Sequence, residues 1–176
     1  MQKINIFGIV GCHLRTLSNS EGKILWSDMA LFYGLPLVIA DFVAIMHWNI
    51  SGDAFDLSIT VFSIFAALLL SVQVALYGVS LRAMNAPKDD KKIKSFNAIK
   101  ASRNVVIKEL NDNISYLIML AVVLVTVFLA ATAMKLEGPL LSAFAVGAYV
   151  HFFLTLLVVV KRASIVFSRE YEAPPT

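Results

Sequence analysis

The sequence predicts an all-α integral membrane protein with four transmembrane helices in two antiparallel hairpins, and with a cytoplasmic helical extension of the second and third spans. Apolar residues occupy 59% of the 176 positions. Most of them fall in four long runs, at 29–48, 57–81, 114–134 and 139–160. At a rise of about 1.5 Å per residue, about twenty helical residues cross a hydrocarbon layer roughly 30 Å thick. Each run is therefore long enough to span the membrane once.

The basic residues indicate how these spans are oriented. Of the 15 lysines and arginines, 14 lie outside the two short connections at 49–56 and 135–138, where only Lys135 is found. Positive charge is retained on the cytoplasmic side of a membrane, so both termini are expected in the cytoplasm. We expect a multi-pass protein of the plasma membrane (the inner membrane in bacteria). The predicted organisation is an N-terminal cytoplasmic segment (1–28), a first transmembrane hairpin (29–81), a basic cytoplasmic helical hairpin (82–113), a second transmembrane hairpin (114–160) and a cytoplasmic tail (161–176).

The connections and helix breakers predict how the elements join. The outer connections are short, which favours sequential antiparallel pairs. Gly34 and Pro36 weaken the first span and predict a kink there. No proline or glycine occurs between Ile93 and Gly138, so a single helix from about 93 to about 135 is expected to extend out of the membrane. An apolar stripe follows its cytoplasmic part and needs a partner, which could be the extension of span two, the N-terminal segment or another subunit. The stripe contains Ile93, Phe96, Ile99, Val106, Ile107, Leu110 and Ile114.

Polar residues inside the spans are the first candidates for function. Asp41 is the only charged residue in the four runs, and a carboxylate at membrane depth usually marks a pathway or a paired site. Gln73, Tyr149 and His151 are further polar groups that could line a pore, and an Asp41–His151 pair is one arrangement. The alternative is a hydrogen-bonded cluster that only holds the helices together.

Cations on the cytoplasmic helix are the second group of candidates. Arg103 falls within the apolar stripe, and Lys100 borders it. Together with Lys94 and Lys108 they could form a site for an anionic ligand. The guanidinium group of Arg103 fits phosphate oxygens, and in a symmetric oligomer every subunit would add its charges to the site. Arg103 could instead snorkel or pair with a nearby carboxylate, and the cluster could hold anionic lipid head groups.

Several other functions are disfavoured by the sequence. It contains no GxSxG, HExxH or P-loop motif, so the protein is not expected to be an enzyme. Cys12 is the single cysteine, which excludes a disulfide within the chain and dithiol redox chemistry. His47 and His151 lie at different depths and make a poor haem site. No cofactor or metal is predicted.

With its small size, four spans and basic cytoplasmic hairpin, the chain resembles the membrane effectors of bacterial anti-phage defence, in particular the Hailong-type effector. Lys94, Lys100, Arg103 and Lys108 below the membrane and Asp41 within it are the residues that would carry this resemblance. It implies an oligomeric channel whose cytoplasmic side holds a nucleotide-derived oligomer, with a nucleotidyltransferase as partner. Loss of the ligand during infection would then open the pore and depolarise the cell.

Two functions follow as hypotheses. The first is a homo-oligomeric ion channel gated from the cytoplasm by an anionic nucleotide or oligonucleotide, because symmetric assembly turns single polar side chains into the rings that select ions. The alternative is a non-conducting accessory or scaffold subunit that docks a soluble partner through the apolar stripe. Both place the protein in contact with the lipid bilayer.

Overall fold

The computed structural model describes residues 6–17, 25–82 and 90–172, and in the last range the side chains of residues 93–168. The described residues form helices joined by short connections, and they contain no strand. Four of its helical segments are long and apolar enough to cross a membrane: Trp26–Ile45, Gly52–Ser80, Ile93–Ala133 and Pro139–Ser168. The individual elements are α1 (Ile6–Arg15), α2 (Trp26–Met29), the π-helix η1 (Ala30–Gly34), α3 (Leu35–Ile45), α4 (Gly52–Ser80), α5 (Asp90–Ala133) and α6 (Pro139–Glu172).

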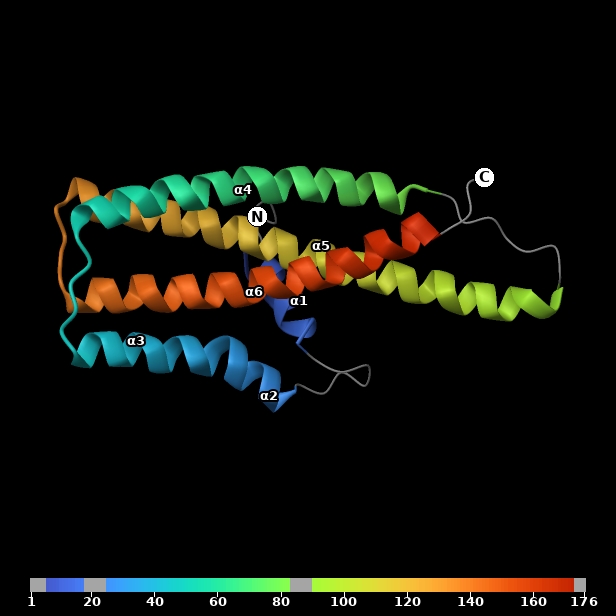
Figure 1. Cartoon of the computed structure of the whole chain (residues 1–176), viewed down its shortest axis with the longest axis horizontal. Helices are drawn as coiled ribbons and strands as arrows, with labels where there is room; N and C mark the ends of the chain where they lie inside the picture. Colours follow the sequence, from blue (N-terminus) through green and yellow to red (C-terminus); the bar gives the residue numbers. More distant parts are fainter. Residues whose placement is uncertain (1–5, 18–24, 83–89, 173–176) are drawn as a thin grey trace.

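The long helices run side by side and alternate in direction (Figure 1). We call the end that carries residues 46–51 and 134–138 the loop end, on the left of Figure 1. We call the part of the molecule from α2 past the last turns of α6 to the start of α5 the basic end. At the loop end, His47 and Lys135 have positive φ values of 52° and 51°, and Gly138 has 143°. Glycine tolerates this region without strain, which suits Gly138 to the turn before Pro139.

The predicted pairing into two sequential hairpins is not confirmed. α5 and α6 pack against each other, as the short connection between them predicts. α3 instead packs against α6, α4 packs against α5, and no contact joins α3 to α4 within the described residues. The six-residue connection between Ile45 and Gly52 is extended enough to separate the two helices, which the length of the connection alone did not reveal (Figure 1).

Gly147 allows the close approach of α3 to α6. A Cβ atom built on Gly147 would lie 3.1 Å from the Ala40 Cβ and 3.3 Å from the Pro36 carbonyl oxygen. Such contacts are tighter than ordinary van der Waals packing, so a side chain here would push the helices apart. The absence of a side chain at Gly147 therefore allows α3 to pack closely against α6.

The predicted long helix forms as α5, a single helix of 44 residues. It extends past α4 and α6 at the basic end (Figure 1). Within its apolar stripe, Ile107, Leu110 and Ile114 are buried, whereas Ile93 is 38% and Ile99 53% exposed. The stripe is thus covered only where other helices lie beside α5.

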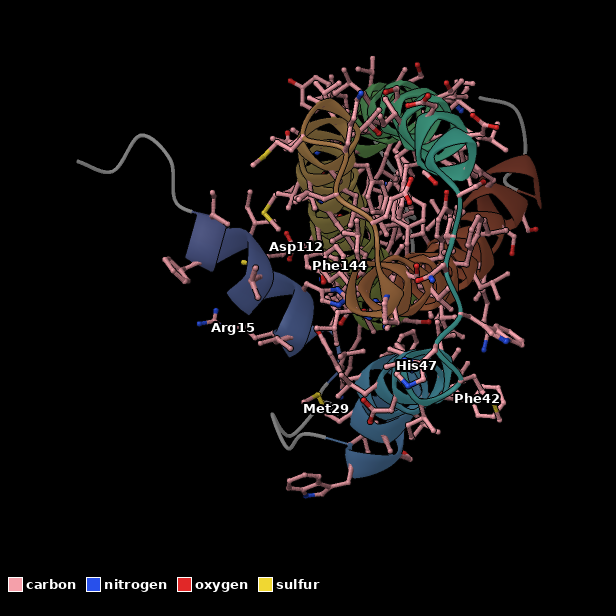
Figure 2. The ribbon with its side chains drawn as sticks, turned by 90° about the vertical axis from the view of Figure 1, so that its left-hand side faces the viewer. Arg15, Met29, Phe42, His47, Asp112 and Phe144 are labelled. Carbon is pink, nitrogen blue, oxygen red and sulfur yellow. The ribbon has the colours of Figure 1, made fainter. Side chains whose placement is uncertain are left out.

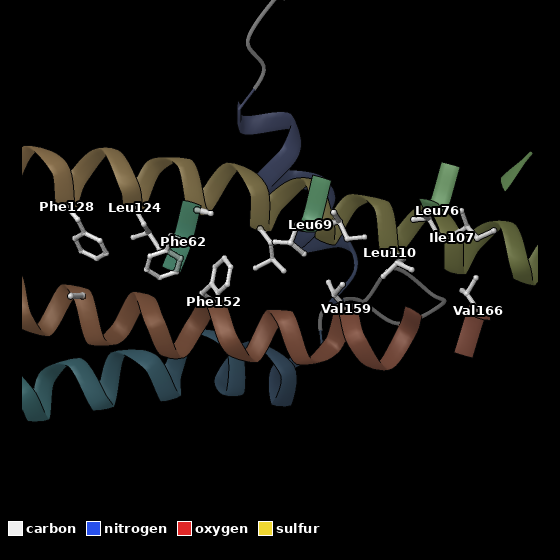
Figure 3. Packing of buried hydrophobic residues seen from close by; sticks show 14 of the residues in the cluster. Phe62, Leu69, Leu76, Ile107, Leu110, Leu124, Phe128, Phe152, Val159 and Val166 are labelled. Carbon is white, nitrogen blue, oxygen red and sulfur yellow. The ribbon is translucent and has the colours of Figure 1, made fainter. Parts of the chain in front are cut away.

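The core of the bundle lies between α4, α5 and α6 (Figure 3). Toward the loop end it consists of rings: Phe62, Phe128 and Phe152 are fully buried, and the Phe62 ring lies 5.0 Å from Phe152 and 6.1 Å from Phe128. Toward the basic end, aliphatic side chains replace the rings. These are Leu69, Leu76, Ile107, Leu110, Val159 and Val166.

Candidate functional site

A buried polar network begins where Pro36 interrupts the first span. Proline has no N–H, so Pro36 cannot donate to the carbonyl of Phe32, four residues earlier. The π-helix η1 covers this stretch, and His151 of α6 satisfies the carbonyl: its Nδ1 lies 2.7 Å from the Phe32 oxygen. Because a carbonyl only accepts, Nδ1 carries the proton and Nε2 is an acceptor. Tyr116 of α5 donates its hydroxyl to this Nε2 at 2.7 Å.

The network continues from Tyr116 into α1. The His13 ring stacks on the Tyr116 ring with centroids 3.9 Å apart and an angle of 2° between the planes. His13 Nδ1 lies 2.8 Å from the Asn113 Oδ1 of α5, to which it donates. The Thr16 hydroxyl has one proton for two acceptors, the His13 carbonyl at 2.7 Å and Asn113 Oδ1 at 2.9 Å. These contacts hold the C-terminal end of α1 on α5.

α1 is thereby fixed across the bundle. It crosses the long helices instead of running along them, with Arg15 at the end nearer the bundle (Figure 2). Phe7, at its other end, is 90% exposed. The end of α1 near the bundle is held by the buried polar contacts of His13 and Thr16, by the stacking of the His13 ring on Tyr116 and by the buried Leu17 that follows the helix.

His13 is neutral in this environment. It is 1% exposed, and burial lowers the pKa of its imidazole to about 4, although the hydrogen bond to Asn113 opposes the shift. The charges of His151 and Arg162 lower the pKa further. Its Nε2 is buried and has no hydrogen-bond partner within the described residues. An unsatisfied buried acceptor of this kind costs about 1–3 kcal/mol.

His13 also lines a pocket of about 540 Å³ at the basic end, formed by the end of α1, α2, η1, α5 and α6. Among the described residues, four charged ones line it, two of each sign. The polar residues Thr16, Asn113 and Thr155 also line it, together with an apolar wall that includes Leu31, Phe32, Val158 and Ile165. The charged residues are Asp28, Glu109, Lys161 and Arg162.

One pair of these charges is already matched. Arg162 Nη1 lies 3.0 Å from Glu109 Oε2, an ion pair held by charge, since the alignment is not that of a hydrogen bond. Arg162 Nη2 donates to the Thr16 carbonyl at 3.4 Å, which links α6 to the end of α1. Asp28 accepts a long bond of 3.4 Å from the Ser27 hydroxyl, and neither Asp28 nor Lys161 has an ion-pair partner in the described part of the chain.

Asp41 lies outside this network, on the surface of the bundle. It is exposed, and no hydrogen bond or ion pair joins it to another described residue. The Asp41–His151 pair considered from the sequence is wrong, because both nitrogens of His151 are engaged by Phe32 and Tyr116. Four residues separate Asp41 from Ile45, the last residue of α3, which puts it about 6 Å from the loop end of that helix.

The other predicted intramembrane residues make contacts with other helices of the same chain. Gln73 of α4 donates from Nε2 to the Asn111 Oδ1 at 3.0 Å and contacts the Ser115 Oγ at 2.9 Å, both on α5. The Tyr149 ring packs 4.8 Å from the Phe62 ring. These contacts, like those of His151, join helices within one chain.

The four predicted ligand-binding cations all lie on the first part of α5. Lys94, Lys100 and Lys108 are exposed along α5, and none of the four lines the pocket at the basic end. Arg103 donates from Nη2 to the Val79 carbonyl at 2.7 Å. It thus caps the C-terminal end of α4, where backbone carbonyls lack partners and a cation is favourable.

Sequence reasoning missed most of the network: His13, Thr16, Asn113, Tyr116, Glu109 and Arg162. One signal was present, since Pro36 predicts a free carbonyl at Phe32 that needs a donor from elsewhere. Asn113, by contrast, lies beside the apolar stripe in the sequence, and nothing there distinguishes it from other polar residues at the edge of an apolar run. No group of three or more His, Cys, Asp or Glu side chains is placed to hold a metal ion within the described ranges.

Comparison with known proteins gives no relative for this site. The chain matches no protein-family model, no curated protein and no solved structure.

Proposed function

We propose that the protein is a homo-oligomer that conducts cations across the membrane, with copies packed through the exposed face of α3 and the basic end in the cytoplasm. The observation that carries this proposal is Asp41, an exposed carboxylate on a helix apolar enough to span the membrane, with no hydrogen bond or ion pair to any other described residue. A carboxylate facing lipid at membrane depth costs at least about 2.5–3.5 kcal/mol, so such residues usually face a protein interior or water.

The surroundings of Asp41 support a second copy as its cover. Its neighbours on the outward face of α3 are large and exposed: Leu37 is 64%, Val38 66% and Ile45 73% exposed. The opposite face, with Pro36 and Val43, is buried. Association through the outward face would bury this apolar surface and gather the carboxylates around a symmetry axis.

The contacts of the other polar residues in the spans also favour an ion pathway between copies over one within a single chain. Gln73, Tyr149 and His151 are engaged in contacts within the chain, as described above. A ring of Asp41 side chains near the loop end would favour cations over anions, as acidic rings do in other pores. The remaining barrier would be the apolar surface of α3 between this ring and the basic end.

Gating by an anionic ligand remains part of the proposal. The exposed Lys94, Lys100 and Lys108 on the projecting part of α5 would supply the positive charge, multiplied by symmetry. A nucleotide or oligonucleotide is the ligand class that the resemblance to defence effectors implies, and depolarisation of the cell is the corresponding outcome.

The test is cation flux into liposomes that contain the purified protein. Asp41→Asn is expected to reduce cation-over-anion selectivity at least about tenfold, because the ring loses its charge. Asp56→Asn is the matched control, since Asp56 is exposed on α4 near the loop end. The oligomeric state is measured on the same samples. A monomer in bilayers, or wild-type liposomes without flux at any ligand concentration, contradicts the proposal.

The ligand gate is tested separately with the same liposomes. Lys100→Glu is preferred to a substitution of Arg103, because Arg103 also caps α4. Nucleotides and short oligonucleotides should alter wild-type flux, and Lys100→Glu should weaken their effect. Unchanged ligand binding and flux in the variant would contradict gating by an anionic ligand but would not contradict ion conduction.

A second function is favoured by one observation, the exposed start of the apolar stripe at Ile93 and Ile99. A scaffold subunit would dock a soluble partner there. Ile99→Asp should then abolish capture of the partner while the membrane helices remain folded. Asn97→Asp, which adds the same charge off the stripe, is the control.

A further inference from the structure

The pocket at the basic end lies where the membrane is expected to meet water. Its polar lining coincides with the ends of the apolar runs: Asp28 precedes the first run, Asn113 precedes the third, and Lys161 follows the fourth. Leu31 and Val158 continue the lining into the apolar part of the bundle. A volume of about 540 Å³ is in the range of small-molecule sites. A ligand here would have one end among polar groups and the other among apolar ones.

The charges of the pocket favour a ligand without net charge. Glu109 and Arg162 are paired with each other at 3.0 Å. Asp28 and Lys161 remain, one carboxylate and one ammonium without an ion-pair partner in the described ranges. An anion alone would gain from Lys161 but be repelled by Asp28, and a cation would meet the reverse. A zwitterion matches both.

The hydrogen-bonding groups favour a cation that donates. Asp28 can only accept, and the Nε2 of His13 is an acceptor because Nδ1 donates to Asn113. That Nε2 has no donor within the described residues. A primary ammonium supplies three N–H groups, whereas a trimethylammonium supplies none. Lys161 is suited to the oxygens of a phosphate, whereas the Thr16 and Thr155 hydroxyls donate their protons within the protein and offer a ligand only acceptor lone pairs.

We propose that this pocket binds a zwitterion with a primary ammonium and a phosphate, the head group of phosphatidylethanolamine or its soluble equivalent. The ammonium lies toward Asp28 and His13, the phosphate toward Lys161, and the glycerol and upper acyl carbons along Leu31 and Val158. This site is separate from the face of α3 that carries Asp41, and it differs from the exposed lysines of α5 in lacking net positive charge.

The test measures binding of four probes to the full-length protein purified in a neutral detergent, by native mass spectrometry and calorimetry. Dihexanoyl phosphatidylethanolamine and dihexanoyl phosphatidylcholine differ only in the methyl groups on nitrogen. Dihexanoyl phosphatidylglycerol replaces the ammonium by neutral hydroxyls, and glycerophosphoethanolamine lacks the acyl chains. The ethanolamine lipid should bind at least about tenfold more tightly than the choline and glycerol lipids, the effect of one charge-assisted hydrogen bond.

Asp28→Asn is the variant that tests the placement of the ammonium. Asp28 is half-buried and its one hydrogen bond is long, so the substitution should leave the fold intact. The preference for ethanolamine over choline should fall about tenfold or more. Asp56→Asn, on the far end of the bundle, should keep it. Thermal unfolding of both variants without lipid verifies that they are folded.

The outcomes separate cleanly. Equal binding of the ethanolamine, choline and glycerol lipids overturns the proposal, and so does a preference that Asp28→Asn leaves unchanged. If glycerophosphoethanolamine binds as tightly as the ethanolamine lipid, the proposal holds with a soluble zwitterion as the ligand. If it binds much more weakly, the ligand is the membrane lipid.

Discussion

The two halves of the bundle are held together by different interactions. Toward the loop end, α4, α5 and α6 share a core of buried rings centred on Phe62. Toward the basic end, α1, η1, α5 and α6 meet through a chain of hydrogen bonds in which His13 and His151 are the central members. The burial of apolar surface by these rings is a non-directional driving force that stabilises the bundle as a whole. Hydrogen bonds with single partners position particular elements, and α1 depends on them most.

The largest effect is expected from breaking the ring core. Phe62→Ala removes a fully buried ring that contacts Phe128, Tyr149 and Phe152. The free energy of unfolding should fall by about 3–5 kcal/mol, the usual result of such a cavity. It is measured by reversible unfolding in mixed micelles. Phe144→Ala, at a ring that is 48% exposed, should cost clearly less; equal losses would contradict a core at Phe62.

Acid should release α1 while the ring core stays folded. Docking holds the pKa of His13 at about 4, below its ordinary value of 6.5. The released form therefore binds more protons, so docking is fully stable above about pH 6.5 and is progressively lost as pH falls toward 4. At pH 5 the docking equilibrium should weaken about 30-fold.

The measurement is labelling of Cys12 by a thiol reagent, normalised at each pH to the unfolded chain. Cys12 is the only cysteine and is half-buried next to His13, so its reactivity reports on α1 alone. His13→Gln removes the imidazole and should remove most of the dependence between pH 6.5 and 4. A pH profile that is the same in this variant would show that His13 does not control the release of α1.

A smaller, local effect is expected when one hydrogen-bond partner of α1 is removed. Asn113→Leu leaves His13 Nδ1 and the Thr16 hydroxyl without their shared acceptor. Cys12 should be labelled about tenfold faster, equivalent to about 1.4 kcal/mol. Asn111→Leu is the matched control, because Asn111 bonds to Gln73 of α4 and not to α1. Faster labelling in both variants would mean that α1 responds to α5 in general.

The smallest effect is expected at the surface of the basic end. Arg103→Met removes the donor to the Val79 carbonyl at the end of α4. Since this bond is only partly buried, the free energy of unfolding should fall by about 0.5–1.5 kcal/mol. Lys100→Met, at an exposed position three residues earlier, should change it less. A loss above that range would show that Arg103 has a larger structural role than capping.

Features that depend on composition or on local sequence could be predicted. The apolar runs predict the four membrane-spanning segments, and the absence of proline and glycine predicts one helix from about 93 to about 135, which forms as α5 (Asp90–Ala133). Gly34 and Pro36 predict a disturbance in the first span, which takes the form of the π-helix η1. Each of these depends on residues close in the chain.

Features that depend on residues far apart in the chain could not be predicted from the sequence. The pairing of α3 with α6 requires the missing side chain at Gly147, and a glycine in an apolar run does not indicate its neighbour. The contact between His13 and Asn113 joins residues 100 positions apart. Arg103 was singled out correctly as unusual within its stripe, yet its contact with Val79 depends on where α4 ends. The site therefore emerges only from the packed helices.

Because α5 is one continuous helix, it connects the projecting part of the molecule directly to the ring core. Its 44 residues extend about 66 Å, more than twice the thickness of the hydrocarbon layer. Ile99 on the projecting part and Phe128 in the ring core lie about 44 Å apart along one rod without a hinge residue between them. A tilt of about 5° about either point would move the other by about 4 Å. A force applied outside the bundle is thus delivered to the packing of its opposite end.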